Sequence, residues 1–263
     1  MLKVLDLFCG CGGLSEGFKL AGYEIVGGVD FNAPAIKTYN RNFPGAKGVC
    51  CDLLNMDQTS IIENFGDLKD IDVIIGGPPC QSWSEAGAGR GIDDSRGKLF
   101  YEFIRVLKDK CPKFFVAENV SGMLADLHKE AVKNILSHFE EAGYNVTVNL
   151  VNAANYDVPQ DRKRVFYIGF RKDLNVNYKF PEPLNYKITL KDAIWDLKDT
   201  AIKAQDKNKT NGNKCFIPNH EYMNGGFSTI YMSRNRVRNW DEQSFTIQAG
   251  GRHAPIHPQA PKM

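Results

Sequence analysis

Residues 71–84 read Ile71-Asp-Val-Ile-Ile-Gly-Gly-Pro-Pro-Cys-Gln-Ser-Trp-Ser84, and this stretch decides the fold. Its first part, Ile71 to Ile75, is a short apolar run rich in β-branched side chains, which is typical of a buried strand. Two glycines and two prolines then end the strand abruptly. Cys80 follows directly, so the sequence predicts a thiol on a rigid turn at the end of a central strand, where a nucleophile would stand.

Apolar runs and amphipathic segments alternate on both sides of this stretch, through about residue 170. Such alternation predicts an α/β fold with a doubly wound, mostly parallel sheet. The expected strands are Leu2–Phe8, Tyr23–Val29, Gly48–Cys51, Ile71–Ile75, Phe114–Ala117, Asn145–Val151 and Val165–Phe170. The expected helices are Leu14–Ala21, Pro34–Phe43, Ser60–Phe65, Lys98–Lys110 and Glu130–Ala142.

The alternation stops at about Asp173, where prolines and a polar, loop-rich segment begin. We therefore predict two domains: residues 1–172 bind a cofactor and carry the chemistry, and residues 173–263 form a smaller domain.

The distribution of charged residues along the chain supports this division. The chain has a net charge of only +2, but Lys203 to Arg252 contains eight Lys/Arg against four Asp/Glu. A weakly acidic front part with a basic back segment fits a cofactor domain followed by a module that binds a polyanion.

Composition excludes several classes of protein. Hydrophobic residues make up 43% of the chain, enough for an ordinary core. No apolar run approaches the roughly 20 residues that span a bilayer, so no membrane partner is expected. The seven cysteines include no CxxC pair, and we expect a cytoplasmic protein with reduced thiols and no metal.

The glycine-rich turn Gly10–Gly13 follows the first expected strand, and Asp30 and Asp52 end the next two. In an open parallel sheet, ligands bind beyond the carboxyl ends of the strands. A glycine turn lets backbone N–H groups approach a ligand, and a strand-end acid can accept hydrogen bonds from a ribose diol. The spacing is neither G-x-G-x-x-G nor a P-loop, which favours S-adenosylmethionine over NAD. Two alternatives stay open: the glycines serve only strand–helix packing, and Asp52 is only a helix N-cap.

Four motifs occur in order: Asp6-Leu-Phe-Cys-Gly-Cys-Gly-Gly-Leu-Ser15, Pro78-Pro-Cys-Gln-Ser82, Glu118-Asn-Val120 and Gln160-Asp-Arg-Lys-Arg164. Together they resemble the DNA (cytosine-5)-methyltransferases. The resemblance implies an S-adenosylmethionine-dependent methyltransferase fold, DNA methylation within a restriction–modification system, and a prokaryotic or phage source with nucleoid association. A sister activity, methylation of a tRNA cytosine, is the alternative within the family.

The chemistry explains the residue types. Carbon 5 of cytosine is a poor nucleophile until a thiolate adds to carbon 6, and Cys80 supplies that thiolate. By resemblance, Glu118 donates a proton to N3, for which a site shielded from water would raise its pKa. Arg164 would hold the O2 of the base, and Arg162 would support the thiolate or the carboxylate.

The resemblance also implies a cofactor pocket. Phe8 and Phe31 would pack on the two faces of the adenine, and Asp30 would bind the ribose. The remaining residues would lie along the methionine part, at the adenine edge or in the pocket wall: Gly10, Cys11, Gly13, Leu14, Asp52, Leu53, Pro79 and Leu99.

A cytosine inside a duplex is unreachable, so double-stranded DNA requires that the base be flipped out. The resemblance implies that the glycine-rich loop from Ser84 to Arg96 closes over the DNA, although it could be a plain surface connector. The phrases 208–215, 218–222 and 232–238 resemble the target-recognition region of the GGCC-specific HaeIII-type modification methylases. We therefore expect methylation of the inner cytosine of GGCC, with DNA contacts from Gln81, Ser82, Ser84, Arg90, Arg234, Arg236, Arg238 and Arg252.

The chain stops at Met263, whereas members of the family continue through a G-N-[AS]-V motif. We expect a fragment, a split enzyme whose second chain supplies that motif, or a degenerate product, each with weak cofactor binding. A non-catalytic DNA-binding remnant is the alternative from another functional class, and a nicotinamide oxidoreductase fits least because of the glycine spacing.

Overall fold

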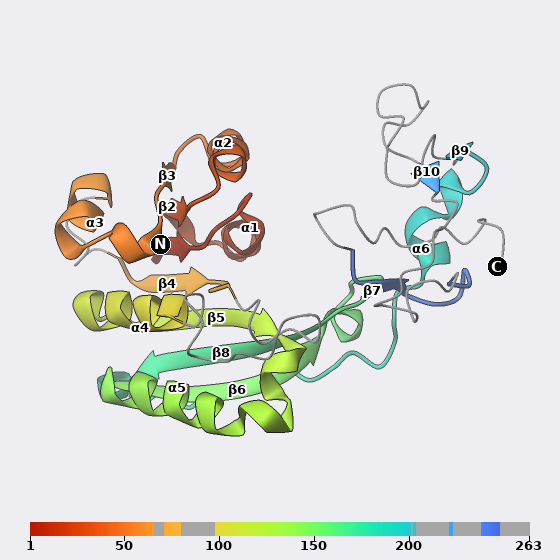
Figure 1. The fold of residues 1–263 in the computed structure, drawn as a ribbon. Coiled ribbons are helices and arrows are strands. Elements are labelled where there is room, and N and C mark those ends of the chain that lie inside the picture. The colour runs from red at the N-terminus through yellow and green to blue at the C-terminus, as the bar shows by residue number, and fades with distance from the viewer. Residues whose placement is uncertain (66–70, 80–97, 201, 204–220, 223–237, 248–263) are drawn as a thin grey trace. The chain divides into compact units, whose positions relative to one another are not determined.

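The computed structural model describes residues 1–65, 71–79, 98–200, 202–203, 221–222 and 238–247 (Figure 1). They belong to two compact units, which we describe separately. One contains Met1–Leu150 and Arg164–Phe180, and the other contains Val151–Lys163 and Pro181–Met263. In the described part of the chain, no helix has both the length and the apolar character needed to cross a membrane.

A seven-stranded sheet forms the centre of the first unit, with the strand order β3-β2-β1-β4-β5-β8-β6 (Figure 1). The strands are β1 (Lys3–Leu7), β2 (Glu24–Asp30), β3 (Lys47–Cys50), β4 (Val73–Gly76), β5 (Phe114–Val120), β6 (Tyr144–Asn152) and β8 (Lys163–Arg171). Strands β3, β2, β1, β4 and β5 pair in parallel, and β8 pairs antiparallel with β5. The predicted mostly parallel α/β sheet is therefore confirmed.

Helices cover both faces of this sheet. They are α1 (Gly13–Leu20), α2 (Ala33–Asn42), α3 (Gln58–Phe65), α4 (Lys98–Lys110) and α5 (Lys129–Glu141). Side chains of α1 pack with Val4 and Val73 on one face, whereas those of α3, α4 and α5 pack with Leu5 and Leu7 on the other. The side chains of a strand point alternately to its two faces, so neighbouring residues of β1 enter different cores.

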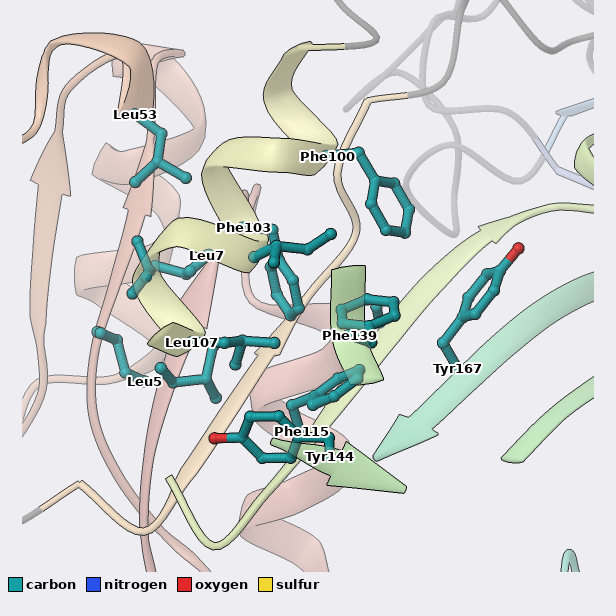
Figure 2. Packing of buried hydrophobic residues seen from close by; sticks show 14 of the residues in the cluster. Leu5, Leu7, Leu53, Phe100, Phe103, Leu107, Phe115, Phe139, Tyr144 and Tyr167 are labelled. Carbon is teal, nitrogen blue, oxygen red and sulfur yellow. The ribbon is translucent and has the colours of Figure 1, made fainter. Parts of the chain in front are cut away.

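The larger core contains a group of aromatic rings beside the aliphatic residues of β1 (Figure 2). The Phe115 ring stacks on Phe139 with centroids 4.4 Å apart and meets Tyr144 edge-on at 5.2 Å. Each of these side chains is at most 1% exposed. Burial of one such ring contributes roughly 1.5–3 kcal/mol, so this group holds α5 against β5.

Strands β5, β6 and β8 are longer than predicted, and the extension of β5 matters most for the site. The strand predicted at Phe114–Ala117 continues to Val120 in β5, because β8 pairs with it as far as Val120↔Arg164. Glu118 thus lies within a hydrogen-bonded ladder, which restrains its backbone.

Short 3₁₀ helices connect several of these elements, at Leu53–Asn55, Ser121–Leu124, Asp126–His128, Ala153–Asn155, Lys172–Leu174 and Trp195–Leu197. Among its described residues, the second unit contains two short parallel ladders, β7 (Gln160–Asp161) with β11 (Ser244–Phe245) and β9 (Ile202–Lys203) with β10 (Glu221–Tyr222). Its helix α6 (Leu190–Ile194) begins with a capping box between Thr189 and Asp192. The second unit takes residues 151–163 from before the predicted boundary at 172, and that boundary stays a prediction.

Candidate functional site

The glycine turn after β1 is tied to the end of β2 by one carboxylate. Asp30 Oδ2 accepts a hydrogen bond from the Gly10 amide at 2.9 Å, and Asp30 Oδ1 accepts one from the Asn32 amide at 2.8 Å. Asn32 in turn caps α2, because its side-chain oxygen accepts from the Ala35 amide. Asp30 therefore fixes the turn relative to the start of α2.

The backbone of this turn takes an unusual path. Phe8, Gly10 and Gly12 all have positive φ angles, of 63°, 53° and 94°. A Cβ on Gly12 would come within 2.2 Å of the Phe43 ring, so that position requires glycine for packing. A Cβ added to Gly10 or Gly13 would meet no atom within 4 Å. Open space beside these two backbones leaves room for a ligand to approach their peptide groups.

Asp6 lies directly below the turn and is completely buried. Ser15 Oγ donates to Asp6 Oδ2 at 2.7 Å and lies 3.2 Å from the Tyr39 hydroxyl, while Asp6 Oδ1 has no hydrogen-bond partner among the described residues. Burial, and to a lesser degree the charge of Asp30, raise the pKa of Asp6 to about 7. Asp6 belongs to the first of the four motifs but has no predicted role, although an acidic residue inside an apolar strand indicates an unusual environment.

Three predicted adenine-pocket residues lie at the ends of β2 and β3. The Phe31 side chain is 69% exposed, and its carbonyl oxygen accepts from the Cys50 thiol at 3.6 Å. Asp52 Oδ1 accepts from the Leu54 amide at 3.1 Å, so Asp52 does cap the short helix Leu53–Asn55. Leu53 is only 3% exposed and its side chain packs in the larger core (Figure 2). Any contact that Leu53 makes with a ligand would therefore come from its backbone.

The predicted catalytic segments meet beside the end of β4. Arg164 Nε lies 2.9 Å from Glu118 Oε1, and their side chains are 20% and 22% exposed. A Cβ on Gly77 would lie 3.5 Å from Glu118 Oε2. Asn119 Nδ2 donates to the Pro78 carbonyl oxygen at 3.4 Å. The structure thus brings together the start of the Gly-Gly-Pro-Pro turn, the Glu118 carboxylate and one arginine.

The remaining predicted site residues do not share one cluster of contacts, so we describe each position separately. Pro79, Leu99, Leu14 and Phe8 are half-buried in the first unit, and Cys11 and Gly13 are exposed on the turn. Arg162 belongs to the second unit, where its amide donates to Asn152 Oδ1 and its carbonyl oxygen accepts from the Ala153 amide. The following predictions lie outside the described residues: Cys80, Gln81, Ser82, Ser84, Arg90, Arg234, Arg236 and Arg252.

Arg238, predicted to contact DNA, is described. Its guanidinium contacts two carboxylates and one ring. Nη2 lies 3.6 Å from Asp161 Oδ2, Nη1 lies 3.1 Å from Glu242 Oε1, and the guanidinium carbon lies 4.0 Å from the centroid of the Phe245 ring.

In the described part of the chain, no three His, Cys, Asp or Glu side chains are grouped to hold a metal ion.

Comparison with known proteins identifies relatives of the whole chain. A family model described as C-5 cytosine-specific DNA methylase matches residues 2–263. The chain is 55% identical to the Type II methyltransferase M.FnuDI of Fusobacterium nucleatum, with 100% of this chain and 75% of that protein covered. It is 53% identical to M.NgoPII of Neisseria gonorrhoeae, with 100% and 76% covered.

Solved structures share the fold. A DNA modification methyltransferase encoded within an E. coli prophage superimposes with a TM-score of 0.76 at 26% identity, covering 100% of this chain and 85% of that one. The DNMT2 of Spodoptera frugiperda superimposes with a TM-score of 0.66 at 18% identity, covering 98% of this chain and 73% of that one, which is a likeness of fold.

Proposed function

Because this chain belongs to the C-5 cytosine-specific DNA methylase family, we propose that it methylates carbon 5 of a flipped-out cytosine in duplex DNA, as the modification half of a restriction–modification system. The family uses S-adenosylmethionine, which supplies an electrophilic methyl group. The observation that carries the proposal is the meeting of Gly77, Glu118 and Arg164 at the end of β4, three residues before Cys80.

The first unit has features that fit this cofactor. The open space beside Gly10 and Gly13 would receive the methionine part, and Cys11 and Leu14 would lie along it. Asp30 would accept from the ribose hydroxyls while it continues to hold the turn. Phe8 and the exposed Phe31 would enclose the adenine, and the Asp52–Leu53 segment would recognise its edge. Pro79 and Leu99 would complete the wall.

Cys80 would provide the nucleophile. Its thiolate would add to carbon 6 of the cytosine and so release an electron pair to carbon 5. Bound S-adenosylmethionine would supply the methyl group, and its sulfur would keep the electron pair of the broken S–CH3 bond and leave as the neutral thioether. Loss of the proton from carbon 5 then expels the thiolate and restores the aromatic ring. No metal is needed, because the thiolate itself activates the ring.

Glu118 and Arg164 would stabilise the base during addition. A protonated Glu118 donates to N3, which neutralises the charge that addition of the thiolate develops on the ring. Arg164, at 2.9 Å from Glu118, would reach the O2 of the base as well as orient the carboxyl group. Arg162 would support the thiolate or the carboxylate.

We propose GGCC as the target, with methylation of its inner cytosine. The support is the resemblance of residues 208–215, 218–222 and 232–238 to the target-recognition region of GGCC-specific enzymes. Arg234, Arg236 and Arg252 would read guanines, since an arginine can bond both O6 and N7. Gln81, Ser82, Ser84 and Arg90 would contact the DNA around the flipped base.

Two experiments test the function. Plasmid DNA incubated with the protein and S-adenosylmethionine is sequenced after bisulfite treatment, and the expected result is protection of the inner cytosine of GGCC alone. Methylation in another sequence would refute the target assignment, and methylation of tRNA in place of DNA would refute the substrate. A duplex with 5-fluorocytosine in GGCC should form a covalent adduct that Cys80→Ser abolishes. Cofactor-dependent methylation by Cys80→Ser would refute the nucleophile.

A further inference from the structure

Asp161 connects several parts of the second unit. Its Oδ1 accepts from Asn152 Nδ2 at 2.8 Å, and its backbone carbonyl oxygen accepts from Thr246 Oγ1 at 2.9 Å. It is also the residue of β7 that pairs with Phe245 of β11. The side chain of Asp161 therefore binds the last residue of β6, and its backbone binds a segment 85 residues later in the chain.

Asn152 links Asp161 to the backbone of Arg162. Its side-chain Oδ1 accepts from the Arg162 amide at 3.1 Å and from the Ala154 amide at 3.2 Å. The Arg162 carbonyl oxygen accepts from the Ala153 amide at 2.9 Å. The orientation of the Asn152 amide group thus determines where the backbone of Arg162 lies, and Asp161 determines that orientation.

Arg238 is bound at the other side of Asp161. Its guanidinium lies over the Phe245 ring with the carbon 4.0 Å from the centroid, and it lies between the carboxylates of Asp161 and Glu242. Glu242 is itself held by the Asn239 amide at 2.7 Å. An arginine that reads guanine presents two N–H groups to the base, whereas here carboxylates face both terminal nitrogens of Arg238.

We propose that Arg238 is a positioning residue, which acts through Asp161 and Asn152 to hold Arg162 in place and so couples the recognition segment to the catalytic one. The proposal rests on the proposed function for its catalytic consequence, but the chain of contacts from Arg238 to Arg162 is independent of it. Arg238 is the last residue of the phrase 232–238 predicted to read DNA, so a displacement of Arg238 by bound DNA would move Arg162.

The test compares Arg238→Met, Asp161→Asn and the double variant in steady-state methylation of a GGCC duplex. Methionine keeps an apolar stem on Phe245 and removes the charge. We expect each single variant to lower kcat about 10- to 100-fold, because small displacements of positioned groups have effects of that order. KM for DNA should change less than about twofold, and the double variant should be no slower than the slower single variant.

Three results would overturn the proposal: a KM that rises tenfold at constant kcat, relaxed preference for GGCC, or additive losses in the double variant. The first two would assign Arg238 to base contact. Arg171→Met is the matched control, because Arg171 forms a comparable ion pair with Asp173 at 2.7 Å in the first unit. It should leave both kcat and KM unchanged.

Hydrogen exchange separates this proposal from the proposed function. Whether or not the wild-type protein methylates GGCC, the Arg162 amide should exchange at least about tenfold faster in Arg238→Met than in the wild type, since loss of Arg238 leaves Asp161, and through it the Asn152 acceptor, less firmly held. Arg171→Met should leave this amide protected. Unchanged protection of Arg162 in Arg238→Met would overturn the positioning role even if activity fell.

Discussion

Arg164 and Glu118 are diagonal neighbours across an antiparallel strand pair, because Glu118 pairs with Phe166 and Val120 pairs with Arg164. The two side chains lie on one face of the sheet, with Nε and Oε1 2.9 Å apart. This relationship gives the proposed acid a fixed position before any substrate binds.

Glu118→Gln should abolish most of the activity while leaving the fold intact. Glutamine keeps the size of the side chain, but its amide cannot transfer a proton to N3 as a carboxylic acid does. We expect kcat to fall about 10²- to 10⁴-fold, measured in single turnovers, and stability to fall by less than about 1 kcal/mol. Glu102→Gln removes a similar ion pair, with Arg105 at 2.7 Å, and should retain full kcat. Equal kcat in the two variants would remove Glu118 from the mechanism.

The two glycines at the end of β4 should respond differently to alanine. A Cβ on Gly76 would lie 2.3 Å from the Leu7 carbonyl oxygen, which cannot move without disturbing the sheet. Gly76→Ala should therefore lower the free energy of unfolding by about 1–3 kcal/mol or more, measured by urea denaturation. Gly77→Ala places its Cβ 3.5 Å from Glu118 Oε2, an ordinary contact, and should unfold as the wild type does. A reversed order of the two stabilities would contradict this geometry.

Asp6→Asn should change the pH dependence of stability. The pKa of Asp6 is raised from its usual 3.8 to about 7, so the folded state binds the proton more tightly than the unfolded state. Protonation of Asp6 therefore stabilises the folded state relative to the unfolded state. This contribution to the free energy of unfolding amounts to at most about 4 kcal/mol, is fully present below about pH 4, and is lost as pH rises through 7. Asparagine can still accept from Ser15, but it does not titrate. The variant should therefore gain stability relative to the wild type between pH 5 and pH 8, and a constant difference over this range would contradict the pKa assignment.

Thiol labelling can locate the cofactor on the structure. Cys11 is exposed on the glycine turn, and Cys50 is exposed with its thiol bonded to the Phe31 carbonyl oxygen. In a Cys80→Ala background, S-adenosylmethionine should slow maleimide labelling of both residues, which mass spectrometry can quantify residue by residue. Cys111 is also exposed, at the end of α4, and its labelling should be unaffected. Equal protection of Cys111 would mean that the effect is not local.

The sequence predicted the strand–helix alternation well, because each element of the first unit has its own hydrophobic period. It did not predict that β5 continues to Val120, since that extension depends on pairing with β8, almost fifty residues later in the chain. The same limit applies to Asp6 and Arg238. Asp6 accepts a hydrogen bond from Ser15, which also lies next to the Tyr39 hydroxyl, and Arg238 contacts Asp161 and Phe245. The fold brings these residues together, so no local sequence pattern predicts the contacts.

The antiparallel pairing of β5 and β8 also restricts which deletions and insertions the protein can tolerate. Because the side chains of a strand alternate, deletion of one residue within β8 would turn Arg164 to the opposite face of the sheet, away from Glu118. Deletion of two residues would restore the face but bring a different side chain to it. An insertion between α5 and β6 escapes this restriction, because it leaves unaltered both this pairing and the contacts among Asn152, Asp161 and Arg162. Length variation among natural variants should therefore be found between α5 and β6 and be absent from β8 itself.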